Sequence, residues 1–90
     1  MNNVIINPEI VKRLEERFNM NLNEVNPTQM TLYNRNNFDK CPYTNVKIKI
    51  KKRGSSYFYL VDELKNMVIT GRKLGESIKL NTVLFLYPKP

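Results

Sequence analysis

Apolar residues recur at helical spacing near the start of the chain and alternate with polar residues through most of the remainder. A helix is expected from Pro8 to about Asn19, because Asn7 can cap its free amides and Pro8 at the first helical position loses no hydrogen bond. Before the helix, residues 4–6 are either a short strand or a flexible arm. The apolar stripe of the helix comprises Ile10, Val11, Leu14 and Phe18.

Strand-like segments dominate the rest of the sequence. The expected strands cover residues 28–33, 46–52, 57–61, 67–70 and 78–87. The second and third are joined by a tight hairpin turn at residues 53–55, and further turns are expected at 62–66 and 71–75. Residues 34–45 form a long polar loop. On the last strand one face carries Ile78, Leu80, Leu84 and Leu86, and Val83, Phe85 and Tyr87 make its second half apolar on the other face too.

This order of elements predicts an α+β fold. One N-terminal amphipathic helix packs on a mainly antiparallel sheet of four to five strands, which is open or curls into a partial barrel. Residues 1–90 are expected to form a single domain, since a chain of this length buries about 60–65% of its unfolded surface in one modest core. The two-sided apolar end of the last strand needs cover on both faces, which the helix supplies on one face and barrel closure or a second subunit on the other.

Residue types that are rare or missing in the sequence exclude several kinds of functional site. No histidine is present and Cys41 is the only cysteine, so the usual general base, histidine-dependent triads, disulfides and thiolate-rich metal sites are excluded. We therefore expect no catalytic residues, no metal, no cofactor and no enzymatic activity. The start of the chain resembles no secretory signal and no apolar run could span a membrane, which predicts a cytoplasmic protein without a membrane partner. A lack of alanine with abundant Asn, Lys and Ile indicates an AT-rich coding sequence, such as that of a virus or mobile element.

The net charge of +7 is carried by one part of the chain. Basic and acidic residues balance through Asn45, whereas Asp62, Glu63 and Glu76 are the only acidic residues after it and the basic residues concentrate between Lys47 and Arg53. Such asymmetry favours a polyanion or an acidic protein surface as the partner.

The expected hairpin determines which side chains share a face with these basic residues. With an odd turn of Arg53, Gly54 and Ser55, Lys51 faces Tyr57 and Lys49 faces Tyr59, so lysines meet phosphates while tyrosines stack on unpaired bases. An even turn mixes apolar residues into the lysine face and favours a protein contact instead. The same alternation also suits a merely solvated strand that resists aggregation. The candidate nucleic-acid-binding residues are Lys47, Lys49, Lys51, Lys52, Arg53, Tyr57, Tyr59, Arg72 and Lys73.

Two functions remain as hypotheses. The first is a small basic, non-enzymatic protein that binds nucleic acid, DNA or RNA and preferably single-stranded, with low sequence specificity. The second is a viral or mobile-element factor that binds a host protein or forms a homodimer. The candidate protein interface for it comprises Phe38, Tyr43, Val83, Phe85 and Tyr87.

Overall fold

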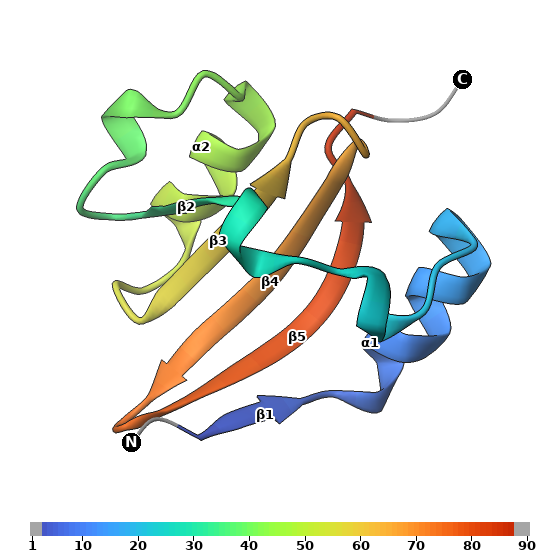
Figure 1. Ribbon diagram of the computed structural model, residues 1–90. Helices are drawn as coiled ribbons and strands as arrows, with labels where there is room; N and C mark the ends of the chain where they lie inside the picture. The colour runs from blue at the N-terminus through green and yellow to red at the C-terminus, as the bar shows by residue number, and fades with distance from the viewer. Residues whose placement is uncertain (1–2, 88–90) are drawn as a thin grey trace.

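The computed structural model describes residues 3–87 and places five strands in one sheet of order β1-β5-β4-β3-β2. β1 runs parallel to β5 and the other neighbours are antiparallel, which confirms the predicted α+β class (Figure 1). Within the described residues the sheet stays open, with β1 and β2 as its edges, so the partial barrel is not formed. The strands are β1 Val4–Ile6, β2 Thr31–Asn34, β3 Tyr57–Asp62, β4 Met67–Leu74 and β5 Ser77–Phe85.

The N-terminal helix forms where the sequence predicts it. α1 (Pro8–Arg13) starts at Asn7, whose side-chain oxygen accepts a hydrogen bond from the Glu9 amide at 3.1 Å, and continues into a wider π-helical turn, η1 (Leu14–Phe18). Ile10 and Leu14 are fully buried against the sheet. Val11, expected in the same stripe, is 46% exposed, because one residue after Ile10 the helix has turned by about 100°.

The segments flanking this helix partly follow the prediction. Residues 4–6 are a strand, so the flexible-arm alternative is wrong. β2 begins three residues later than expected, because Asn26 caps a 3₁₀ turn over Pro27–Gln29. Two further 3₁₀ turns, η2 (Leu22–Glu24) and η4 (Phe38–Lys40), lie in the connections.

The largest difference from the prediction lies at residues 44–52, which form a helix, α2 (Thr44–Lys52), instead of a strand. The alternation of lysine and isoleucine satisfies a strand, but Val46 and Ile50 are also four residues apart and therefore share one face of a helix. Both side chains are buried against the sheet at 3% and 1% exposure, while Ile48 is 47% exposed. Tertiary packing of this pair outweighs the strand propensity of β-branched residues. The expected hairpin of residues 46–61 does not exist.

β4 and β5 form a longer hairpin than predicted. β4 continues through residues 71–74, so the turn expected at 71–75 shrinks to the segment around Gly75, which has a φ of 62°. The β4–β5 register shifts between Thr70 and Gly71, leaving Asn81 as the extra residue of a β-bulge. As a result Leu80 packs beside α1 and Leu84 packs beside α2, so the single apolar face predicted for this strand is wrong.

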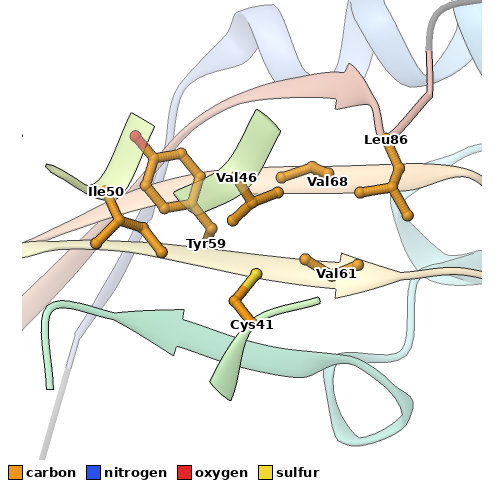
Figure 2. Packing of buried hydrophobic residues seen from close by; sticks show 7 residues of the cluster. All are labelled: Cys41, Val46, Ile50, Tyr59, Val61, Val68 and Leu86. Carbon is orange, nitrogen blue, oxygen red and sulfur yellow. The ribbon is translucent and has the colours of Figure 1, made fainter. Parts of the chain in front are cut away.

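Each face of the sheet is covered by a helix. On the α1 face Ile10 and Leu14 pack with Met67, Ile69 and Val83. On the α2 face the core comprises Cys41, Val46, Ile50, Tyr59, Val61, Val68 and Leu86, as Figure 2 shows. The second face of the last strand is thus covered by α2, and neither barrel closure nor a second subunit is needed there.

Candidate functional site

A cavity of about 380 Å³ lies between the C-terminal end of α2 and the sheet, and we call it the basic cleft. From α2 and the residue that follows it come Lys49, Lys52 and Arg53. The sheet supplies Tyr57 and Tyr59 from β3, Thr70 from β4, and Asn81, Thr82 and Leu84 from β5.

The helical turn of α2 places the lysines of residues 47–52 on two flanks of the helix. Lys49 and Lys52 are three residues apart and therefore lie on the flank that faces the cleft. Lys47 and Lys51 lie on the other flank, where the Lys51 ammonium group is 5.6 Å from the centre of the Phe38 ring. All of these lysines except Lys47 are in the last turn of α2, where positive charge also stabilises the negative end of the helix dipole.

Arginine side chains gather at Tyr57. The guanidinium carbons of Arg53 and Arg72 lie 5.2 Å and 5.4 Å from the centre of its ring. Such cation–π contacts hold both guanidinium groups beside the cleft without neutralising their charge. Arg72 is paired across the β-ladder with Lys79, and directly opposite residues share one side of a sheet, so Lys79 adds a further cation on this side.

The positive charge of the cleft is not balanced by neighbouring carboxylates. No Asp or Glu lines the cleft. The ion pairs within residues 3–87 involve Lys12 and Arg13, which belong to the N-terminal helix. Partial burial lowers the pKa of Lys49, and repulsion from Arg53 lowers it further. The charges in the cleft therefore repel one another, and an anion bound between them would relieve that repulsion.

Tyr59 occupies the floor of the cleft. It is only 3% exposed, and its burial raises the pKa of the phenol, while Arg53 lowers it and Tyr57 raises it. Figure 2 shows its hydroxyl at the end of the cluster away from Leu86. A ring this deeply buried has no free face for a base, so the predicted stacking by Tyr59 is not available, and its hydroxyl is what the cleft can use.

The structure brings together part of the predicted nucleic-acid-binding set. Lys49, Lys52, Arg53, Tyr57 and Tyr59 line the cleft, and Arg72 contacts Tyr57 beside it. The pairs Lys51/Tyr57 and Lys49/Tyr59 expected from a hairpin do not occur, because α2 is helical and β3 pairs instead with β2 and β4.

Three predicted cations lie elsewhere. Lys47 and Lys51 are on the far flank of α2, and Lys73 follows Arg72 in β4, so strand alternation directs its side chain to the opposite face of the sheet. They do not line the basic cleft, and their role in binding nucleic acid stays a prediction.

Sequence reasoning missed Thr70, Lys79, Asn81 and Thr82. The detectable signal was that polar residues interrupt otherwise apolar strand positions, as Thr70 does two residues after Val68. Asn81 was harder to find, because it enters the cleft through the bulge that shifts the β4–β5 register.

The residues predicted as a protein interface are spread over both faces of the sheet. Val83 is fully buried, and the Phe85 ring lies 4.9 Å from that of Phe18 on the α1 face. Phe38 and Tyr43 pack against the α2 core, and Tyr87 is 51% exposed with its ring 6.3 Å from that of Tyr43. They do not form one surface: Val83 is covered within the chain, whereas Tyr87 stays half exposed.

The part of the chain that the structure describes offers neither a metal site nor a membrane-spanning helix. Residues 3–87 contain no cluster of three or more His, Cys, Asp or Glu side chains that could hold a metal ion. The Cys41 thiol is buried, with its sulfur 3.6 Å from the carbonyl oxygen of Tyr43. Every helix of this region is too short or too polar to span a lipid bilayer.

Comparison of the chain with protein-family profiles, with curated proteins and with solved structures finds no match.

Proposed function

We propose that this protein is a small, non-enzymatic nucleic-acid-binding protein that contacts the phosphate backbone through the basic cleft. The observation that carries the proposal is the convergence of Lys49, Lys52 and Arg53 on one cavity that has no carboxylate among its lining residues. Ammonium and guanidinium groups form charge-assisted hydrogen bonds to phosphate oxygens, and phosphate contacts provide most of the affinity of non-specific binding.

The shape of the cleft favours single strands. A cavity of about 380 Å³ admits a phosphate and one nucleotide, not a duplex. The Arg53 and Arg72 guanidinium planes beside Tyr57 are surfaces on which an unpaired base can stack. Phosphate contacts carry no sequence information, so low sequence specificity follows.

The protein-interaction alternative remains a prediction without a dedicated surface. Its motive was the apolar surface of Val83, Phe85 and Tyr87 at the end of the last strand, together with the polar loop of residues 34–45. Val83 is 0% exposed and Tyr87 is 51% exposed. Unlike that strand, the basic cleft presents exposed cations whose charge a bound anion can neutralise.

Fluorescence anisotropy with labelled single-stranded DNA, single-stranded RNA and duplex DNA at several salt concentrations tests the proposal. If the three cations of the cleft neutralise three phosphates, the logarithm of the binding constant should fall with the logarithm of salt concentration at a slope of about −2. Single strands of different sequence should bind with similar affinity and more tightly than the duplex. A slope near zero, or no binding at low salt, would refute the proposal.

A further inference from the structure

The basic cleft contains more hydrogen-bond donors than its cations alone. The hydroxyls of Tyr59, Thr70 and Thr82 and the amide of Asn81 line the same cavity. None of these side-chain groups makes a hydrogen bond to another part of residues 3–87. They are therefore available to a ligand, together with the ammonium groups of Lys49 and Lys52 and the guanidinium of Arg53.

Apolar side chains border the cleft at one end. Beyond Lys49 and Leu84 the space between α2 and the sheet narrows to a cavity of about 10 Å³, which is too small for a phosphate. Val46, Val68 and Leu86 fill that region with apolar side chains. A phosphate in the cleft therefore cannot move past Lys49 and Leu84 into this narrower, mainly apolar space.

A shallower hollow of about 450 Å³ adjoins the cleft on the outer side of α2. It shares Lys49 and Lys52 with the cleft and is also lined by Asn45, Ile48 and Phe85. A chain whose end sits in the cleft can therefore leave across these lysines, where its next phosphate meets the same positive charge.

From these features we propose that the cleft receives a terminal phosphate monoester of a nucleic-acid strand in preference to an internal phosphodiester. The inference rests on the proposed function. A monoester carries up to two negative charges and three acceptor oxygens at neutral pH. An internal diester carries one charge and two free oxygens.

The number of hydrogen-bond donors in the cleft also favours a phosphate monoester. The Lys49, Lys52 and Arg53 cations and the hydroxyl and amide donors exceed what the two free oxygens of a diester can accept. A dianion accepts hydrogen bonds from more of these donors and neutralises more of the clustered charge.

The test compares matched oligonucleotides on the full chain. Internally labelled single strands of one sequence are prepared with a 5′-phosphate, a 3′-phosphate or hydroxyls at both ends, and their affinities are measured by anisotropy at constant ionic strength. A terminal phosphate at one of the two ends should tighten binding about tenfold, which corresponds to one additional strong charge-assisted contact. The two phosphorylated strands show which end is recognised.

A pair of threonine variants locates the effect. Thr82→Val removes a hydroxyl from the cleft without changing charge or shape, and should weaken binding of the phosphorylated strand several-fold more than binding of the strand with hydroxyl ends. Thr31→Val changes an exposed strand position on β2 and should leave the preference intact. Equal affinity for all three strands would overturn the monoester inference alone, whereas failure of every strand to bind would overturn the proposed function as well.

Discussion

At the scale of single residues, Gly71 is the position where the sheet leaves no room for a side chain. A Cβ atom built there would overlap the ring of Phe58, which is 5% exposed and lies directly across the ladder. Gly71→Ala should lower the free energy of unfolding by about 1–3 kcal/mol, because the buried ring must shift. Urea denaturation measures this change.

Gly54 provides the matched control for that substitution. No atom lies within 4 Å of the corresponding Cβ position, so Gly54→Ala should change the free energy of unfolding by less than about 0.5 kcal/mol. Equal effects at the two glycines would contradict the packing described around Phe58.

Tyr43 gives a residue-scale prediction about pH. Its hydroxyl donates a hydrogen bond to Glu63 Oε2 at 3.1 Å, and burial, followed by that hydrogen bond, raises the pKa of Tyr43 to about 12. An acid whose pKa is raised on folding contributes stability that is complete below the unfolded value of about 10 and is lost as the pH rises toward 12.

An absorbance titration of the phenols measures this directly. Wild-type protein should show a late-titrating phenol that is missing from Tyr43→Phe, and the variant should lose less stability than the wild type between pH 10 and 12. If the substitution instead removes a phenol that titrates near its ordinary pKa of 10, the hydrogen bond to Glu63 is wrong.

At the scale of elements, α2 decides the architecture, and two isoleucines distinguish a helix from a strand there. Ile50 is 1% exposed and Ile48 is 47% exposed, whereas a strand would place both on one face. Ile50→Ala should lower the free energy of unfolding by about 2–5 kcal/mol, because it leaves a cavity against Tyr59 and Val61.

Ile48→Ala is the control on the same helix. Since its side chain is largely exposed and alanine favours helices, its cost should be below about 1 kcal/mol. Chemical denaturation of both variants gives the comparison, and similar large losses at the two positions would favour a strand over residues 46–52.

The elements also show how much of this fold could be predicted from sequence. Capping at Asn7 and the spacing of Ile10 and Leu14 were sufficient for the first helix, and alternation was sufficient for β3 and for most of β5. Alternation failed at residues 46–52, because a lysine–isoleucine repeat satisfies both periods and only the facing residues decide between them.

The candidate site was predictable to a similar degree. The local charge pointed to the segment that lines the basic cleft, including Lys49, Lys52 and Arg53. It could not separate these from Lys47 and Lys51, because that division depends on the helical turn of α2. The threonine hydroxyls of the cleft could not be predicted from the sequence either, since Thr70 and Thr82 meet only through the pairing of β4 with β5.

At the scale of the whole molecule, part of the net charge of +7 is concentrated on α2 and at the basic cleft. A helix covers each face of the sheet (Figure 1). On one flank of α2 Lys49 and Lys52 line the basic cleft, and on the other flank Lys51 lies beside Phe38. General electrostatic attraction would depend on the total charge alone, whereas binding in the basic cleft depends on the flank from which that charge is removed.

The most direct test of binding in the cleft therefore compares two variants of equal charge by anisotropy with the same labelled single strand. Lys49→Gln with Lys52→Gln removes two charges from the cleft flank of α2, and Lys47→Gln with Lys51→Gln removes two from the other flank. Glutamine and lysine have similar helix propensities, so the helix should persist in both variants. The cleft pair should weaken binding at least tenfold and flatten the salt dependence by a slope of about 1.4, while the outer pair should weaken it no more than about threefold. Equal weakening by the two pairs would contradict the account, because the basic cleft would then contribute nothing beyond the overall charge.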